Sequence, residues 1–257
     1  MDHEALHDLA VEAAHRAGAL LLERFRSSVR LVGTKSSATD PVSEADHASE
    51  QLLLDVLRDE RPDDGILAEE GGVGESRSGL TWVIDPLDGT VNFLFGIPMW
   101  AVSIAVEDAH GGVVGVVFDP IRDETFSAIR GEGARLNGAR IEVSPKEDLS
   151  TALIGTGFSY EAGAREVQAE RLVRLLPKVR DIRRAGSAAV DLCWTASGRL
   201  DGFFEAPMEV WDKAAGVLIM SEAGAVVSEL EAPLDLSAGI IAANPTLHDR
   251  LRSLVLG

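Results

Sequence analysis

The stretch from Trp82 to Phe93, WVIDPLDGTVNF, constrains this chain more than any other segment. Its apolar start predicts a buried strand that ends at two aspartates, Asp85 and Asp88, with Pro86 stiffening the turn between them. Two carboxylates at a rigid corner can hold a divalent cation, and the backbone N–H groups after Asp88 would face an anion at the same point. The stretch therefore indicates phosphate chemistry. Asp-Gly after proline is also ordinary turn chemistry, so this segment alone leaves both interpretations open.

The composition predicts a globular protein of ordinary make-up. Its 257 residues suffice for one large or two modest domains, and 46% of them are hydrophobic. The net charge of −18 is opposite to the basic face of most nucleic-acid binders, and it disfavours anionic membranes. Neither nucleic acid nor membrane is therefore expected as a partner. Most of the surplus acids are interpreted as a solvated surface, and a small cluster of them as a possible metal site.

The cysteine and histidine residues limit the kinds of bond and catalytic site that this chain can form. Cys193 is the only cysteine, so no internal disulfide can form, and its apolar surroundings predict a place in the core. No Ser-His-Asp or Cys-His arrangement is apparent, and none of the six histidines has metal-ligand spacing with another. The acidic N-terminus lacks the pattern of a signal peptide, and no apolar run has the length of a membrane span. We therefore expect a cytoplasmic protein.

Hydrophobic periodicity predicts alternating helices and strands. Helices are expected near 4–25, 43–59, 165–176, 187–197, 212–223 and 247–255, and strands near 66–68, 82–84, 99–107, 113–118, 125–129, 153–157, 202–205, 225–228 and 239–242. A polar segment near 146–150 indicates a hinge between an N-terminal α+β half, 1–148, and a C-terminal α/β half, 149–257. The pattern predicts a layered α/β or α+β protein.

Further acids lie where they would join the aspartate corner. Glu69 and Glu70 follow the predicted strand 66–68, so two neighbouring strands would present carboxylates side by side. Asp212 opens a small-residue helix, where an acid is also an ordinary helix cap. Asp46 and Glu50 share one helix face, which by itself is typical of a solvated surface. Carboxylates gathered without cations would repel one another strongly, whereas Mg²⁺ ions sharing them would support in-line attack of water on phosphate.

Taken together and in order, these segments resemble the inositol monophosphatase family of Mg²⁺-dependent, lithium-sensitive sugar-phosphate phosphatases. The resemblance rests on Asp40–Asp46 (DPVSEAD), Gly65–Glu70 (GILAEE), Trp82–Phe93, Arg184–Cys193 (RAGSAAVDLC), Trp211–Gly216 (WDKAAG) and Glu222–Gly224 (EAG). It covers nearly the whole chain. Ser43 in place of the commoner threonine and Ala225 in place of a second glycine depart from the family pattern. These departures leave the metal chemistry intact and the substrate preference open.

The resemblance implies an αβαβα sandwich of the sugar-phosphatase type, usually a homodimer, that acts on a small-molecule phosphate ester. It also implies two or three Mg²⁺ ions, for which Mn²⁺ could substitute because hard oxygen ligands suit both. The first ion would be bound by Glu69, Asp85 and the carbonyl of Leu87. The second would be bound by Asp85, Asp88 and Asp212, and a third, looser ion by Glu69.

Catalytic and substrate-binding roles are implied in the same way. Glu70 would support the activated water, Thr90 and Asp46 would polarise it without a covalent phosphoenzyme, and Lys35 would lie in a loop that helps to organise the metals. The phosphate and the alcohol would be held by Asp88, Gly89, Thr90, Gly186, Ser187, Ala188 and Glu205. Taken by itself, Glu205 can also be interpreted as an ordinary acid on the protein surface.

The expected function is a Mg²⁺-dependent phosphomonoesterase acting on inositol 1-phosphate or a similar small polyol or sugar phosphate. One alternative keeps this chemistry on fructose 1,6-bisphosphate, histidinol phosphate or a nucleotide phosphate. Another makes the chain a regulatory protein associated with the transcription machinery, as bacterial relatives can be.

Overall fold

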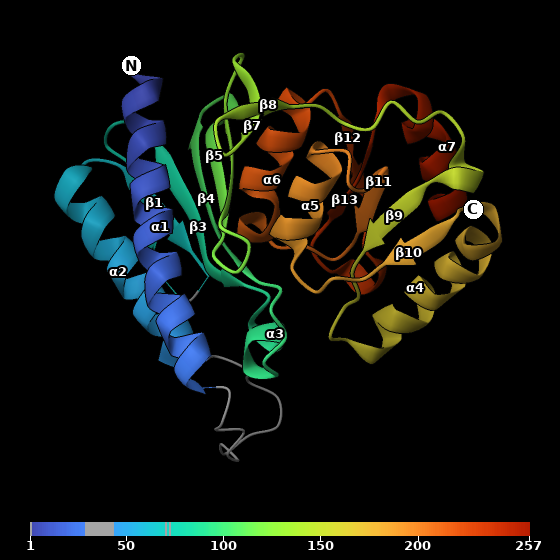
Figure 1. Cartoon of the computed structure of the whole chain (residues 1–257), viewed down its shortest axis with the longest axis horizontal. Coiled ribbons are helices and arrows are strands. Elements are labelled where there is room, and N and C mark those ends of the chain that lie inside the picture. The colour runs from blue at the N-terminus through green and yellow to red at the C-terminus, as the bar shows by residue number, and fades with distance from the viewer. Residues whose placement is uncertain (1, 29–43, 70, 72) are drawn as a thin grey trace.

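The computed structural model describes residues 2–28, 44–69, 71 and 73–257. Within them, two β-sheets alternate with three layers of helices (Figure 1). The predictions made for Lys35, Asp40, Ser43 and Glu70 lie outside the described residues.

The first sheet is built from the N-terminal half of the chain. Its strands are β1 (Gly65–Ala68), β2 (Val73–Gly74), β3 (Thr81–Asp88), β4 (Ala101–Asp108), β5 (Gly111–Asp119), β6 (Glu124–Ile129), β7 (Gly133–Leu136) and β8 (Ala139–Ile141), in the spatial order β2-β1-β3-β4-β5-β6-β7-β8. Only the β1–β3 pair is parallel among these neighbours. Parallel neighbours end at the same edge of a sheet, which matters for the acids that follow them.

The second sheet belongs to the C-terminal half. Its strands are β9 (Leu153–Thr156), β10 (Asp181–Arg183), β11 (Gly202–Glu205), β12 (Val226–Leu230) and β13 (Gly239–Ala243), in the order β10-β9-β11-β13-β12. The two sheets therefore divide between Ile141 and Leu153. The boundary of the two halves at 148/149 stays a prediction.

Helices cover both sheets and fill the space between them. They are α1 (His3–Ser28), α2 (Glu44–Glu60), α3 (Thr90–Leu94), α4 (Ala162–Leu175), α5 (Ala188–Ala196), α6 (Val210–Glu222) and α7 (Pro245–Leu256). Figure 1 shows α1 and α2 on the outer face of the first sheet, α5 and α6 between the sheets, and α4 and α7 beyond the second sheet. This order confirms the predicted αβαβα sandwich.

The middle layer joins the two sheets through a shared apolar core. Cys193 is fully buried in it, as its apolar surroundings predicted. Helix α6 lies directly on β5, because a Cβ atom at Gly115 would stand only 2.8 Å from the carbonyl oxygen of Ala215. The C-terminal end of α6 is also held, since the Glu222 carboxylate accepts bonds from the N–H groups of Gly131 and Gly133, each at 2.7 Å. The direction of α6 is thus fixed at both its middle and its end.

Several short elements were not predicted, and one strand was predicted too short. The hydrophobic pattern did not predict β2, α3, β7, β8 or β10, because these elements have only two to five residues and are too short to show a repeat. The strand expected to end at Ile84 continues as β3 to Asp88, with a register shift against β4 between Asp85 and Asp88. The irregular pairing accommodates Pro86, which cannot donate to a neighbouring strand. None of the described helices is both long and apolar enough to cross a membrane.

Asp64 anchors the start of β1 through a buried carboxylate. It accepts bonds from Arg61 Nε (2.8 Å), Ser78 Oγ (2.5 Å) and Trp82 Nε1 (2.9 Å). Burial opposes ionisation, but these donors outweigh it and hold the pKa of Asp64 below its usual value.

We expect Asp64→Asn to lower the free energy of unfolding by about 1–3 kcal/mol at neutral pH, because the charge is lost and the NH₂ group replaces an oxygen that accepts two of these bonds. A depressed folded-state pKa gives stability above the unfolded pKa of about 3.9 that is lost as the pH falls through the folded value. Urea unfolding should therefore show the wild-type advantage shrinking below about pH 4.

The matched control is Asp63→Asn, because the Asp63 carboxylate is exposed and pairs with Arg77 at the surface. Its loss should stay below about 0.5 kcal/mol. Equal losses for the two variants would contradict an anchoring role for Asp64.

Candidate active site

Most of the residues implied by the sequence line one pocket of about 400 Å³. Those that line it are Glu69, Asp85, Leu87, Asp88, Gly89, Thr90, Gly186, Ser187, Ala188, Glu205 and Asp212. They come from both sheets and from the two middle helices, so the pocket forms only when the sandwich is assembled. Asp46 is not among the lining residues, but its carboxylate lies within hydrogen-bond distance of the Thr90 hydroxyl.

The parallel pairing of β1 and β3 brings two of the acids to the same edge. Ala68 stands opposite Ile84 in the register, so Glu69 and Asp85 follow neighbouring positions on adjacent strands. Asp85 is almost fully buried, and its Oδ1 accepts a bond from the Leu87 N–H at 3.0 Å. That bond folds the Asp-Pro-Leu turn and leaves the other oxygen, Oδ2, for a ligand.

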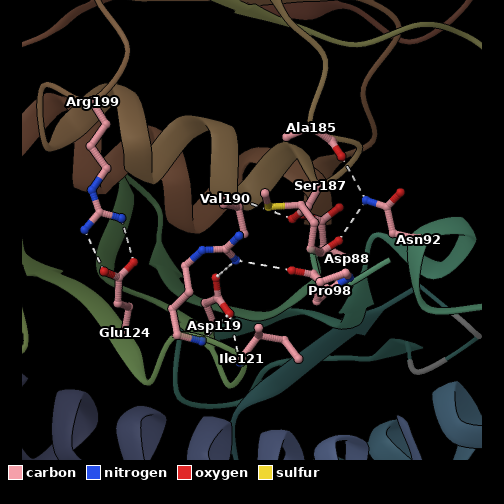
Figure 2. A network of polar contacts seen from close by, with 12 residues as sticks. Asp88, Asn92, Pro98, Asp119, Ile121, Glu124, Ala185, Ser187, Val190 and Arg199 are labelled. Carbon is pink, nitrogen blue, oxygen red and sulfur yellow. Dashed lines mark hydrogen bonds and ion pairs between the residues drawn. The ribbon is translucent and has the colours of Figure 1, made fainter. Parts of the chain in front are cut away.

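The carboxylate of Asp88 is held at the N-terminal end of α5. It accepts bonds from Ser187 Oγ at 2.5 Å, from the Ala189 N–H at 2.7 Å and from the Ala188 N–H at 3.3 Å. Ser187 is also the N-cap of α5, accepting from the Val190 N–H at 3.3 Å. Figure 2 shows Asp88 and Ser187 meeting between β3 and α5. The helix end favours negative charge, yet burial dominates and raises the pKa of Asp88.

A tight turn carries the chain from β3 into α3. Gly89 adopts a left-handed conformation with φ of 94°, and a Cβ there would lie 2.9 Å from the Met99 carbonyl oxygen. Only glycine meets both conditions without strain. Asn92 then donates from Nδ2 to the carbonyls of Met99 (2.8 Å) and Ala185 (2.9 Å), as Figure 2 shows for Ala185. The aspartate turn and the segment before α5 are thereby held together.

Thr90 and Asp46 form a polar pair beside the pocket. The Thr90 hydroxyl lies 3.0 Å from the Leu87 carbonyl oxygen and 3.3 Å from Asp46 Oδ2, either of which can accept its proton. Asp46 is 1% exposed and Glu50 is also buried, so the interpretation of their helix face as solvated was wrong. A helix face that packs on β3 cannot be told from a solvated one by acid spacing alone.

Asp212 takes part in capping helix α6 and also lines the pocket. Its Oδ2 accepts from the Glu209 N–H at 2.7 Å, and the Glu209 side chain completes a capping box at the start of α6. The helix-cap interpretation of Asp212 is therefore confirmed, and Asp212 also lines the pocket, while its role as a metal ligand stays a prediction. Burial and the nearby charge of Asp88 raise its pKa to about 7.

Burial, together with repulsion between carboxylates, sets the electrostatics of the pocket. Burial, followed by the charges of Glu69, Asp88, Asp212 and Asp46, raises the pKa of Asp85 well above its usual value. Glu205 lines the same pocket rather than the outer surface, and burial together with Asp212 raises its pKa to about 8. Of the described residues that line the pocket, Arg184 alone carries a positive charge.

The donor set fits hard divalent cations. Carboxylates and one carbonyl oxygen are the ligands that Mg²⁺ and Mn²⁺ prefer, and added positive charge would relieve the repulsion. In the described part of the chain, no three His, Cys, Asp or Glu side chains already converge as a finished ligand cage. The carboxylates of Asp88 and Asp212 instead accept bonds from backbone N–H groups, Asp88 at the N-terminus of α5 and Asp212 at the start of α6.

Some lining residues received no role from the sequence. Arg184 and Asp191 stand inside the Arg184–Cys193 run, but a motif does not tell which of its side chains face the pocket. Phe158 and Tyr160 come from the connection between β9 and α4, which has no repeated pattern to mark it. Asp191 is almost fully buried, and burial with the charge of Asp88 raises its pKa to about 8.

Comparison with known proteins decides the family. The sequence model of the inositol monophosphatase family matches residues 2–256. The chain belongs to the inositol monophosphatase family. This confirms the resemblance and the phosphatase class that the sequence predicted.

The relatives carry two kinds of name. The chain is 45% identical over 260 residues to the inositol-1-monophosphatase SuhB of Mycobacterium tuberculosis, covering 95% of this chain and 89% of the relative. It is 41% identical over 242 residues to the Nus factor SuhB of Haemophilus influenzae, covering 93% and 91%. Among solved structures, the extragenic suppressor protein SuhB of Bartonella henselae superposes with a TM-score of 0.88 at 38% identity, covering 98% of each chain.

Proposed function

We propose that this protein is a Mg²⁺-dependent phosphomonoesterase that hydrolyses inositol 1-phosphate or a similar small polyol or sugar phosphate. The observation that carries the proposal is the convergence of Glu69, Asp85, Asp88 and Asp212 on one pocket beside Thr90. The name of the mycobacterial relative supports inositol 1-phosphate as the first substrate to test.

The proposed metal ligands come from the edge of the first sheet and from α6. Glu69, Asp85 and the Leu87 carbonyl would hold one Mg²⁺, Asp85, Asp88 and Asp212 a second, and Glu69 a looser third. Bound there, the ions would supply the positive charge that activates water and stabilises the leaving oxygen. Mn²⁺ fits the same oxygen ligands.

The protein groups around the ions would orient the water and the ester. The Thr90 hydroxyl, within reach of both Leu87 and Asp46, would hold the water in line and pass a proton toward the Asp46 carboxylate. The N–H groups of Gly89 and Thr90 would bind phosphate oxygens. Asp88, Gly186, Ser187, Ala188 and Glu205 would contact the hydroxyls of the alcohol. Glu70 would support the water, and Lys35 the metals.

Asp212→Asn isolates the charge of one proposed ligand. Asparagine keeps an oxygen that can accept the Glu209 N–H, so the helix cap survives while the charge is lost. We expect kcat/KM for phosphate release from myo-inositol 1-phosphate to fall by about a hundredfold or more, with a higher Mg²⁺ requirement and no loss of unfolding free energy. Phosphate release is measured over a Mg²⁺ titration.

The substrate panel adds fructose 1,6-bisphosphate, histidinol phosphate and a nucleotide monophosphate. Phosphate release from one of these esters but not from inositol 1-phosphate would support the proposed active site and change the assigned substrate. Turnover unaffected by Asp212→Asn would contradict the proposed metal site. No Mg²⁺-dependent release from any ester by the wild type would favour the regulatory alternative, which the name of the Haemophilus relative, Nus factor, also supports.

We also propose that the enzyme is a homodimer, as the family resemblance implies. Leu94, Phe95 and Ile97 form an exposed apolar patch at α3, and Phe95 is 72% exposed. Such a patch is costly in water and typical of a subunit contact. Sedimentation should give a dimer for the wild type and a shift toward monomer for Phe95→Glu. A monomeric wild type would rule the dimer out, and a dimer that Phe95→Glu leaves intact would move the contact elsewhere.

A further inference from the structure

A glycine at the end of β9 leaves the room in which the Glu205 carboxylate lies. Strands β9 and β11 are parallel neighbours in the second sheet (Figure 1), and Thr156 pairs with Phe204 in their register. The next position along each strand brings Gly157 beside Glu205, on the same face of the sheet. A Cβ atom at Gly157 would overlap the Glu205 carboxyl group, whose carbon and two oxygens are its three nearest neighbours. The carboxylate of Glu205 therefore lies across the end of β9.

The backbone at Gly157 does not itself require glycine. Gly89 and Gly186 adopt the left-handed conformation that favours glycine, whereas Gly157 does not, so an L-residue can adopt its backbone angles. The atoms that a side chain there would displace belong to the flexible end of Glu205 and not to the backbone. We therefore expect an alanine at this position to move the carboxylate and to leave the sheet intact.

The backbone of Glu205 is held more firmly than its carboxylate. On the other neighbouring strand, β13, a Cβ atom at Gly239 would overlap the Glu205 carbonyl oxygen and stand 2.7 Å from the Cα of Ala206. Glu205 also pairs with Ile240 in the register of β11 and β13. Gly239 thus packs against the backbone of Glu205, and Gly157 against its carboxyl group. The sheet fixes where Glu205 begins, and the room at Gly157 decides where its carboxylate ends.

The carboxylate placed in this way is free to accept bonds from a ligand. Gly157 and Glu205 both line the pocket, and no group of the described residues donates a hydrogen bond to the Glu205 carboxylate. The carboxylates of Asp88 and Asp212 differ, because backbone N–H groups donate to them. Burial and the charge of Asp212 raise the pKa of Glu205 to about 8. A hydroxyl of the alcohol would supply the donor that the described protein groups do not.

We infer that Gly157 is a specificity-determining residue: the absence of a side chain there keeps the Glu205 carboxylate in the pocket, where it selects phosphate esters whose alcohol half carries hydroxyl groups. This inference rests on the proposed function, which places the alcohol at Glu205. Gly157 acts through Glu205 and not on the reacting atoms, so it is a positioning residue. A glycine that only made room for the substrate would behave differently, since its replacement would matter even without Glu205.

The test compares two esters that share a cyclohexane ring, myo-inositol 1-phosphate, whose ring carries hydroxyls, and cyclohexyl phosphate, whose ring carries none. The wild type should give the higher kcat/KM with the inositol ester. Gly157→Ala should lower the ratio of the two kcat/KM values by about ten- to a hundredfold, chiefly through KM for the inositol ester, because bonds to a carboxylate are lost. The Mg²⁺ concentration that gives half the maximal rate should not change, since the proposed metal ligands are not displaced.

A double-mutant cycle shows whether Gly157 acts through Glu205. Glu205→Ala should lower the same ratio, and adding Gly157→Ala should lower it no further, because the carboxylate that would be displaced is gone. If Gly157→Ala alone does not fold, the double variant should fold for the same reason. The matched control is Gly163→Ala in α4, because Gly163 does not line the pocket and a Cβ there would meet Leu234 Cδ1 at 3.1 Å. This control should keep the wild-type ratio.

The outcomes separate this inference from the function on which it rests. No Mg²⁺-dependent release from any tested ester would contradict the proposed function, and the role of Gly157 with it. An active wild type that does not prefer the inositol ester would overturn the inference alone. So would a Gly157→Ala variant that keeps the ratio or loses both esters equally. A further fall of the ratio in the Glu205→Ala background, or a double variant that does not fold, would also overturn it, because Gly157 would then not act through Glu205.

Discussion

The burial of neighbouring carboxylates in one pocket is the constraint on which the site depends. Burial raises the pKa values of Asp85, Asp88 and Asp212, and the charges of neighbouring carboxylates raise those of Asp85 and Asp212 further. A fold gains no stability from gathering ionised acids in this way. The cluster makes physical sense as a binding site for divalent cations, whose positive charge would offset the repulsion among the carboxylates.

The sandwich holds these acids against their repulsion by fixing each to a separate element. The Leu87 N–H holds Asp85, the N-terminus of α5 holds Asp88, and the start of α6 holds Asp212. Each carboxylate thus has a backbone donor of its own, while α6 is fixed on β5 by the absence of a side chain at Gly115. Because the anchors come from the first sheet and the middle helix layer, loosening either layer would disturb the ligand geometry.

The sequence predicts the elements that have a repeating hydrophobic pattern and the residues that belong to a recognised motif. Long helices such as α1 and α6 follow from periodicity, and the acids of the pocket follow from the motif resemblance. The spacing of Asp46 and Glu50 alone favoured a solvated face, because acid spacing on a helix does not reveal what covers the face, and only the motif resemblance placed Asp46 at the site. The length of β3 was missed because proline and aspartate normally end a strand, whereas here an irregular pairing with β4 carries the chain on to Asp88. The orientation of Arg184 depends on packing against Gly186, which no local pattern encodes.

The central claim is tested most directly by the thermal stability of Asp85→Asn with and without Mg²⁺. Asparagine can keep the bond from the Leu87 N–H while it removes one charge from the cluster. In EDTA, the variant should melt a few degrees above the wild type, because repulsion is reduced. In Mg²⁺, the wild type should gain stability that the variant does not share. A variant less stable than wild type in EDTA, or an equal gain from Mg²⁺ for both proteins, would contradict the account.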